Sequence, residues 1–295
     1  MKKVKGILLA GGYGTRLHPL TLGVSKQLLP VYDKPMIYYP LSTLMYAGIN
    51  QILIITTVED QSNFKNLLGD GSEIGIKLSY AQQKKPNGIA EALKIGSNFI
   101  GEDNVCLILG DNIFHGNDFI SNLDKAKSNL FKGYSTIFGV QVKNPNQFGV
   151  VQLNSNNEIL KIIEKPKIEC GNLIVSGLYY YTNEVIKIAM DLKPSSRGEY
   201  EITDVNNSFL EKDKLKLIKL DPEIVWTDTG TYDSLIFASQ YFKEFEGKFD
   251  KKVACIEEIA LNKGYINKSD LLVIANKMKN SNYGKYLFNI AKYEN

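Results

Sequence analysis

The sequence is poor in the residues on which covalent and metal chemistry most often depends. Its 295 residues include two histidines, three cysteines and one tryptophan. Cys106, Cys170 and Cys255 are far apart and outside any C-x-x-C pattern, which argues against a disulfide framework and a structural zinc site. We expect these cysteines to be small, buried, apolar residues. The sequence also contains no evident pair of a nucleophile and a general base.

Charge and hydrophobicity exclude further classes of protein. The net charge is +3 and no charged run is long, so neither nucleic acid nor a membrane surface is indicated as a partner, whereas small anions remain possible ligands. The first apolar run is too short for a secretory signal, and no stretch approaches the length of a membrane span. We therefore expect a cytoplasmic protein. The 44% hydrophobic content suffices for one large α/β domain, alone or with an appendage.

A glycine-rich turn near the N-terminus is the strongest local signal. The apolar strand expected at residues 4–9 runs into G-G-Y-G-T-R, which contains Gly11, Gly12 and Gly14. Such a turn exposes backbone N–H groups that can bind phosphate. The spacing fits neither a Walker loop nor the dinucleotide-binding glycine pattern. Residue spacing alone leaves two interpretations open, a phosphate loop of another kind or a tight turn with solvated cations beside it.

The first half of the chain alternates strands and helices. This rhythm predicts a largely parallel sheet covered on both faces, in which ligands gather at the C-terminal ends of strands. The glycine turn and Asp111 both follow strands, so we expect them to face one site. The expected strands are 4–9, 51–56, 76–81 and 104–109, and the expected helices are 36–47, 60–68 and 89–99.

The second half has a more antiparallel pattern. Short apolar runs separated by Asn, Pro and Gly turns predict a lobe of hairpins on the main sheet, and the sequence after Asp250 is helical only. We therefore expect a core at residues 1–245, with a first half at about 1–115 and the lobe at about 134–230, and a helical appendage at 246–295. The expected strands are 134–142, 149–153, 159–163, 174–181 and 224–227, and the expected helices are 183–192, 201–210 and 232–245.

Several motifs together carry a family resemblance. They are G-G-Y-G-T-R-L-H-P-L-T and S-K-Q-L-L-P-V-Y-D-K-P-M-I-Y-Y-P-L near the N-terminus, L-G-D-N-I-F at 109–114, F-G-V-V at 148–151, E-K-P at 164–166, R-G-E-Y-E-I-T-D-V-N at 197–206 and W-T-D-T-G-T at 226–231. Over essentially the whole chain the sequence resembles the sugar nucleotidyltransferase family, and within it the bacterial glucose-1-phosphate thymidylyltransferases.

This resemblance implies a fold, a reaction and an assembly. The fold would be a Rossmann-like three-layer αβα nucleotidyltransferase with a mixed, mostly parallel sheet. The enzyme would condense dTTP with glucose 1-phosphate to give dTDP-glucose and pyrophosphate, for polysaccharides of the dTDP-rhamnose type, and would be a homotetramer. The sugar phosphate is already ionised at neutral pH, so catalysis needs cations, backbone donors and Mg²⁺ rather than a base. The scarcity of histidine fits this chemistry.

The resemblance also implies roles for individual residues. Arg16, Lys26, Asp111, Lys165 and Asp228 would be catalytic, and Asp111 and Asp228 would hold Mg²⁺, which usually takes one or two protein carboxylates. If they are not ligands, these aspartates simply cap turns. The nucleotide would be bound by Leu9, Gly11, Gly12, Gly14, Thr15, Arg16, Lys26, Gln27, Gln83, Gly88 and Asp111. The sugar phosphate would be bound by Asn112, Gly149, Glu164, Lys165, Val175, Tyr179 and Trp226.

For three positions the sequence gives a more specific expectation. Pro166 favours an extended backbone at Lys165. Phe148 stands where the family often has Tyr, so a hydroxyl is missing. Gln83, expected with Gly88 to read the base, has an amide that can both donate and accept, which suits the N3–H of thymine and its flanking carbonyls but not cytosine.

Two alternatives to a thymidylyltransferase remain. One is the same fold using UTP, CTP or another sugar 1-phosphate. The other is an inactive regulatory protein that binds a sugar nucleotide, which the full set of cations and aspartates disfavours. The segment after Asp250 predicts amphipathic helices that either associate with another subunit or dock on their own core. Their apolar residues are Val253, Ile256, Ile259, Leu271, Leu272 and Ile274.

Overall fold

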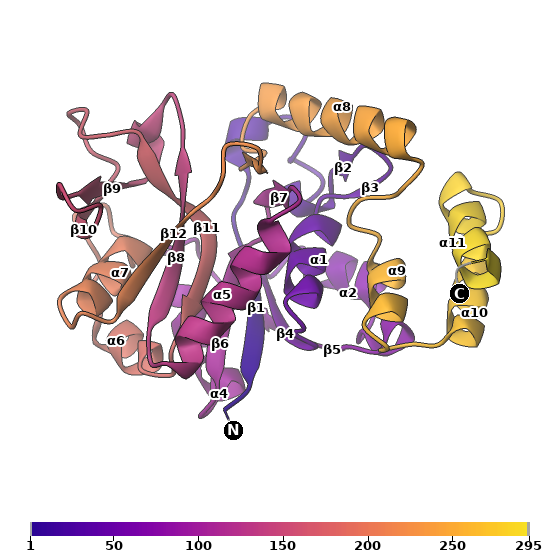
Figure 1. Ribbon diagram of the computed structural model, residues 1–295, viewed down its shortest axis with the longest axis horizontal. Helices are drawn as coiled ribbons and strands as arrows, with labels where there is room; N and C mark the ends of the chain where they lie inside the picture. The colour runs from indigo at the N-terminus through magenta and orange to yellow at the C-terminus, as the bar shows by residue number, and fades with distance from the viewer. Residues whose placement is uncertain (1, 294–295) are drawn as a thin grey trace.

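A nine-stranded mixed sheet forms the centre of the protein (Figure 1). The computed structural model describes residues 2–293. The strand order is β10-β9-β11-β6-β1-β4-β5, with β8 beside β11 and β12 beside β8. The strands are β1 (Val4–Ala10), β4 (Gln51–Thr56), β5 (Lys77–Gln82), β6 (Asn104–Leu109), β8 (Ser135–Gln141), β9 (Gly149–Leu153), β10 (Ile159–Glu164), β11 (Leu173–Tyr181) and β12 (Leu215–Lys219).

The sheet divides into a parallel half and a largely antiparallel half. Strands β6, β1, β4 and β5 are parallel to one another. Strand β11 is antiparallel to β6, β8 and β9, and β9 and β10 form an antiparallel hairpin. Only β12, which pairs parallel with β8, departs from the antiparallel pattern of the lobe. The expected mixed sheet with an antiparallel lobe is therefore confirmed.

Alternate residues of the central strands enter two separate cores, as strands buried on both faces require. In β1, Leu8 and Ala10 belong to one core, and Ile7 and Leu9 to the other. The first core includes α1 (Tyr38–Tyr46), α2 (Gln61–Leu68), α5 (Phe119–Phe131), α9 (Ile256–Asn262), α10 (Lys268–Lys277) and α11 (Asn282–Tyr293). The second includes α3 (Glu91–Ile95), α4 (Ser97–Ile100), α6 (Val185–Asp191) and α7 (Ile202–Leu210). The three-layer αβα arrangement is thus confirmed.

A third, smaller core joins α8 (Tyr232–Phe249) to the first half of the chain. Helix α8 lies along the top of the molecule in Figure 1, above the small hairpin of β2 (Pro30–Val31) and β3 (Lys34–Pro35). Strand β13 (Val225–Thr227), which leads into α8, pairs with β7 (Ile113–His115) rather than with the main sheet. This small pairing brings the segment after β13 next to the segment after β6.

Some expectations about local structure were wrong. The helix expected at 89–99 is two short helices separated at Gly96. Glycine fits there because an added Cβ would lie 2.6 Å from Cδ1 of Ile7. Helix α5 and strand β12 were not anticipated. Cys106 and Cys255 are buried as expected, but Cys170 is half-buried.

The C-terminal helices dock on the core of their own chain. Helix α9 packs against α1, and α10 and α11 lie beyond it, at the right-hand end of Figure 1. Ile256, Ile259, Leu271 and Ile274 are all buried within this chain, so they offer no surface to another subunit. Among the described residues, no helix is both long and apolar enough to cross a membrane.

Candidate active site

The glycine turn and Asp111 meet because the strands before them are neighbours. Leu9 of β1 pairs with Leu109 of β6, so both strands end at the same edge of the sheet, where ligands of such sheets bind. Gly14 has a left-handed backbone (φ 62°) and starts a short 3-10 helix at Thr15–Leu17 that presents Arg16. Glycine adopts this conformation without the steric cost of a Cβ.

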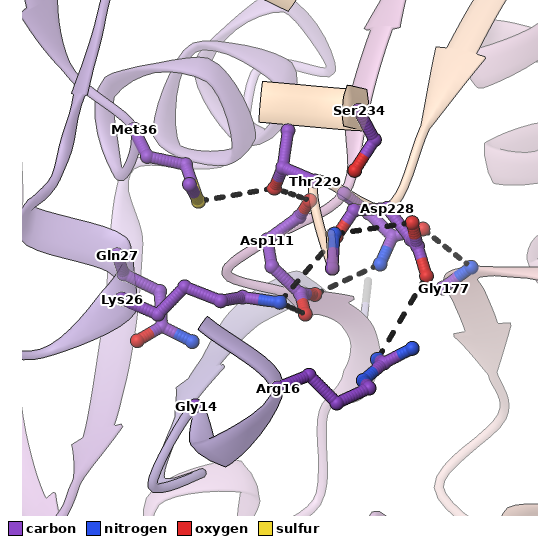
Figure 2. Close-up of polar contacts among 12 residues, drawn as sticks. Gly14, Arg16, Lys26, Gln27, Met36, Asp111, Gly177, Asp228, Thr229 and Ser234 are labelled. Carbon is purple, nitrogen blue, oxygen red and sulfur yellow. Dashed lines mark hydrogen bonds and ion pairs between the residues drawn. The ribbon is translucent and has the colours of Figure 1, made fainter. Parts of the chain in front are cut away.

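Lys26 and Asp111 form the central ion pair of the site. Lys26 Nζ lies 2.5 Å from Asp111 Oδ2, and the lysine side chain is only 7% exposed. The same ammonium is 3.4 Å from the backbone carbonyl oxygen of Asp228. The other carboxylate oxygen of Asp111 accepts a hydrogen bond from Asn112 Nδ2 at 2.9 Å. Figure 2 shows Lys26 extended toward Asp111 with Asp228 close by, so the carboxylate is held at both oxygens.

A second, looser ion pair lies at the entrance. Arg16 Nη2 is 3.9 Å from Asp228 Oδ2, and the arginine side chain is 57% exposed. Its Nη1 also donates to Gln147 Oε1 at 3.3 Å. Gly230 leaves room for the guanidinium, since an added Cβ there would lie 2.8 Å from Arg16 Nη2. Arg16 is therefore placed beside the site but remains open to solvent.

The turn after β13 is tied to the turn after β6. Thr229, which has a left-handed backbone (φ 40°), donates its hydroxyl to the backbone carbonyl of Asp111 at 2.7 Å. The Asp228 carboxylate accepts from the backbone N–H of Gly230 at 3.2 Å. The two aspartates are thus fixed relative to each other by backbone contacts as well as through Lys26 (Figure 2).

A cavity of about 180 Å³ extends from these charged residues into the antiparallel lobe. Arg16, Asp111 and Asp228 line its charged end. The structure also brings all the residues expected to bind the sugar phosphate into this one cavity. They are Asn112, Gly149, Glu164, Lys165, Val175, Tyr179 and Trp226.

Thr203 and Arg197 contact Glu164 but were not predicted from the sequence as site residues. Thr203 donates to Glu164 Oε2 at 2.5 Å, and Arg197 Nη1 lies 3.4 Å from Glu164 Oε1. Both belong to the R-G-E-Y-E-I-T-D-V-N motif, which was the signal that could have identified them. Lys165 Nζ lies 4.0 Å from the same carboxylate oxygen, Glu164 Oε1.

The expected extended backbone at Lys165 is wrong. Its φ is 40°, in the left-handed region. The Lys165 N–H donates to the carbonyl of Phe148 at 3.0 Å, which closes the β9–β10 pairing. The hairpin therefore overrides the preference set by Pro166. The Phe148 ring meets Trp226 edge-on, with ring centroids 5.6 Å apart.

Gln83, Gly88 and Gly11 come together on the other side of the glycine turn. Gln83 is 4% exposed, and a Cβ added at Gly11 would lie 2.2 Å from Gln83 Oε1. Gly88 has a φ of 106° and packs so closely against the backbone of Tyr200 that a Cβ would clash.

The other residues expected to bind nucleotide surround the same turn. Leu9 is near the end of β1 and Thr15 begins the 3-10 helix. A Cβ added at Gly12 would have no atom within 4 Å, so this part of the turn is open. Gln27 is buried, and its Oε1 accepts from the Ser25 hydroxyl at 2.8 Å.

Asp111 and Asp228 provide a donor set that suits a divalent cation bound together with substrate. Among residues 2–293, no three His, Cys, Asp or Glu side chains group as a metal site. Mg²⁺, however, usually takes one or two protein carboxylates and completes its shell with phosphate oxygens and water. The two carboxylates are therefore sufficient ligands if a phosphate supplies the others.

Comparison with known proteins identifies the family of this chain. Residues 5–244 match the nucleotidyl transferase family. The chain is 50% identical to glucose-1-phosphate thymidylyltransferase of Neisseria meningitidis, over 98% of this chain and 100% of that protein. It is 48% identical to glucose-1-phosphate thymidylyltransferase of Mycolicibacterium smegmatis, over 99% and 100% of the two chains.

Two solved structures share the fold. One is a Bacillus anthracis protein assigned as glucose-1-phosphate thymidylyltransferase, in complex with sucrose (TM-score 0.75, 38% identity, 81% of this chain and 95% of that one). The other is a UDP-glucose pyrophosphorylase in complex with UDP-glucose (TM-score 0.72, 27% identity, 83% and 100%). The matches extend over nearly the whole chain, and this protein belongs to the nucleotidyl transferase family, in its group of glucose-1-phosphate thymidylyltransferases.

Proposed function

We propose that this protein condenses dTTP with α-D-glucose 1-phosphate to give dTDP-glucose and pyrophosphate. A phosphate oxygen of the sugar attacks the α-phosphorus of dTTP directly, and the bond from that phosphorus to the bridging oxygen of the β-phosphate breaks. The attacking oxygen is ionised at neutral pH, so no base has to remove a proton. The names of the close relatives support this reaction.

The observation that carries the proposal is the buried ammonium of Lys26, which is paired with Asp111 at the charged end of the cavity. Pyrophosphate leaves with more negative charge than it carried in dTTP, and fixed cations stabilise that charge as it develops. Lys26 is 7% exposed and already bonded to Asp111, so its charge acts with little solvent screening. Arg16 adds a second cation on the solvent side.

We propose that Mg²⁺ is the metal and that Asp111 and Asp228 hold it. Enzymes of this type are generally metal-dependent. Bound there, Mg²⁺ would supply positive charge to the phosphate oxygens. Lys26 lies 2.5 Å from the Asp111 carboxylate and 3.4 Å from the Asp228 carbonyl, so it keeps both aspartates close before a metal binds.

The sugar 1-phosphate is proposed to occupy the lobe end of the cavity. Lys165 would neutralise its phosphate, and Glu164, oriented by Thr203, would accept hydrogen bonds from sugar hydroxyls. Gly149 and Val175 would contact the sugar mainly through their backbones. Phe148 packs on Trp226 and has no hydroxyl with which to bind the sugar.

The nearest alternative is the same reaction with UTP, because a UDP-glucose pyrophosphorylase shares the fold. Thymine differs from uracil by one methyl group, whose burial is worth only about 1 kcal/mol, so we expect dTTP to be preferred over UTP by about tenfold or less on this account. Pyrophosphate release should be measured with dTTP, UTP, CTP and several sugar 1-phosphates. Preference for a purine nucleotide, or release without formation of a nucleotide sugar, would contradict the proposal.

We also propose a homotetramer that works in the cytoplasm and supplies dTDP-glucose for polysaccharides of the dTDP-rhamnose type. Because Ile256, Ile259, Leu271 and Ile274 are buried within the chain, the exposed apolar side chains of α8 are better candidates for subunit contact. They include Ile236, Phe237 and Phe249. Light scattering at micromolar concentration should give four times the mass of one chain, and a mass equal to one chain would rule the tetramer out.

A further inference from the structure

A chain of hydrogen bonds beside the glycine turn fixes the orientation of a buried amide. Gln83 Nε2 donates to the backbone carbonyl of Gly88 at 3.2 Å and to Glu91 Oε2 at 2.7 Å. Asn87 Nδ2 donates to the other oxygen of the same carboxylate, Glu91 Oε1, at 2.9 Å. Gln83 is only 4% exposed. Its amide is therefore held inside the protein by two partners.

The chemistry of those partners decides which way the amide points. A backbone carbonyl and an ionised carboxylate can only accept hydrogen bonds. Both must therefore face the NH₂ group of Gln83, and the two hydrogens of that group are then used. Turning the amide over would place its oxygen against two other oxygens, which is unfavourable in a buried position. Only Gln83 Oε1 remains for a ligand, and it can only accept.

The remaining oxygen points at the glycine turn. A Cβ on Gly11 would lie 2.2 Å from Gln83 Oε1, so the oxygen lies directly against the backbone where the nucleotide is proposed to bind. The sequence led us to expect an amide that both donates and accepts. In the structure both of its donor hydrogens are already used, so Gln83 can only accept a hydrogen bond from a ligand.

We propose that Glu91 is a positioning residue that sets the base preference by holding Gln83 as an acceptor. A pyrimidine with N3–H, such as thymine or uracil, pairs with this oxygen. Cytosine has a lone pair at N3, which would face the amide oxygen and be repelled by it. This inference rests on the proposed function, since it assumes that the base lies beside Gln83.

The test compares dTTP with dCTP, which share the same deoxyribose. The measured quantity is the ratio of their kcat/KM values, with dissociation constants from calorimetry as a second readout that needs no turnover. Glu91→Leu removes the closer of the two acceptors that hold the Gln83 NH₂ group and leaves only the Gly88 carbonyl at 3.2 Å. We therefore expect the preference for dTTP to fall by about tenfold, the effect of one hydrogen bond to a charged group. Turnover with saturating dTTP should change much less.

Three further variants separate orientation from packing. Glu91→Gln should keep the preference, because its oxygen can accept from Gln83 while its NH₂ donates to a reoriented Asn87. Glu184→Leu is the matched control: this carboxylate is also half-buried and pairs with Lys212 and Lys214 instead, and its loss should leave the preference unchanged. Asn87→Ala removes only the second tether of Glu91, and should lower the preference by about twofold to threefold. If Glu91→Leu does not fold, Asn87→Ala decides.

A double-mutant cycle tests whether Glu91 acts through Gln83. In a Gln83→Leu background, Glu91→Leu should have no additional effect on the ratio. Unchanged preference in both Glu91→Leu and Asn87→Ala would overturn the inference, as would a full effect of Glu91→Leu without Gln83. A different result would contradict only the proposed reaction. In that case the parent protein forms no nucleotide sugar, but its preference for binding dTTP over dCTP still falls in Glu91→Leu.

Discussion

The two cation–carboxylate pairs of the site differ in nearly every physical respect. Lys26 and Asp111 are 2.5 Å apart, and the lysine side chain is 7% exposed. Arg16 and Asp228 are 3.9 Å apart, and the arginine side chain is 57% exposed. The first pair is a charged hydrogen bond with little access to water, and the second is a loose pair screened by solvent.

This difference indicates different roles in one reaction. A buried, fixed cation needs no reorganisation when charge develops in the transition state, so Lys26 is suited to stabilising the leaving pyrophosphate. An exposed arginine can reach an arriving triphosphate and follow it inward, so Arg16 is suited to binding. The comparison predicts that Lys26 affects mainly kcat and that Arg16 affects mainly KM.

The largest effect is expected for Lys26. Lys26→Met should lower kcat by about 10³-fold, because the lost charge acts in the transition state. Steady-state kinetics with dTTP and glucose 1-phosphate measure this. Circular dichroism must show an intact fold, since the variant leaves Asp111 without its cation. A fall in kcat of less than about threefold would show that Lys26 does not act mainly in the transition state, and the proposed difference between Lys26 and Arg16 would be wrong.

The aspartates should come next. Asp111→Asn and Asp228→Asn each remove a proposed metal ligand while keeping the shape of the side chain. We expect turnover to fall by about 10²-fold or more in each variant with the fold intact. Mg²⁺ titrations of both variants would show whether more metal restores activity. Wild-type turnover in either variant would mean that its carboxylate holds no metal during the reaction.

A smaller effect is expected for Arg16. Arg16→Met should raise the KM for dTTP by about tenfold and change kcat by less than about threefold, because the pair it loses is exposed. The effect on KM should shrink as salt rises, since screening already weakens the parent's attraction for the triphosphate. If kcat falls as far as in Lys26→Met, exposure does not separate the roles of the two cations.

The smallest effect concerns a buried carboxylate outside the site. Burial raises the pKa of Glu257, which accepts a hydrogen bond from the Tyr283 hydroxyl at 2.6 Å. A raised folded pKa stabilises the fold at low pH, and this contribution is lost as pH rises through that pKa. The neutral side chain of Glu257→Gln does not lose stability in this way. The melting temperature of the variant minus that of the parent should therefore be about 2–4 °C larger at pH 8 than at pH 5. A difference between the two proteins that does not change with pH would show that the carboxylate does not titrate on unfolding.

Much of the fold could be predicted because its signals are local. The alternation of apolar strands with helices gave the parallel half, and short apolar runs between turns gave the lobe. Helix α5 was missed although Phe119, Leu123, Ala126 and Leu130 follow a helical spacing and are buried. Strand β12 is a weaker signal, because it has only five residues, L-K-L-I-K, in which two adjacent apolar residues interrupt the alternation with lysine.

The site could be predicted as a set of residues but not as a set of contacts. The motifs placed Asp111 and Asp228 after strands. That both lie within reach of Lys26, however, depends on how β7 pairs with β13. The fixed orientation of Gln83 depends on Glu91, a helix residue that no motif marks. The backbone at Lys165 depends on a hairpin bond to Phe148. Each of these features is set by a partner distant in sequence or by side-chain conformation, which spacing alone does not encode.

The most direct test of the account is the metal dependence of the unmodified protein. The protein is incubated with dTTP, glucose 1-phosphate and excess chelator, and dTDP-glucose is measured by chromatography before and after Mg²⁺ is added. We predict no detectable product in chelator and full turnover once Mg²⁺ exceeds it, because Lys26 and Arg16 alone do not neutralise the triphosphate. Undiminished formation of dTDP-glucose in excess chelator would contradict it.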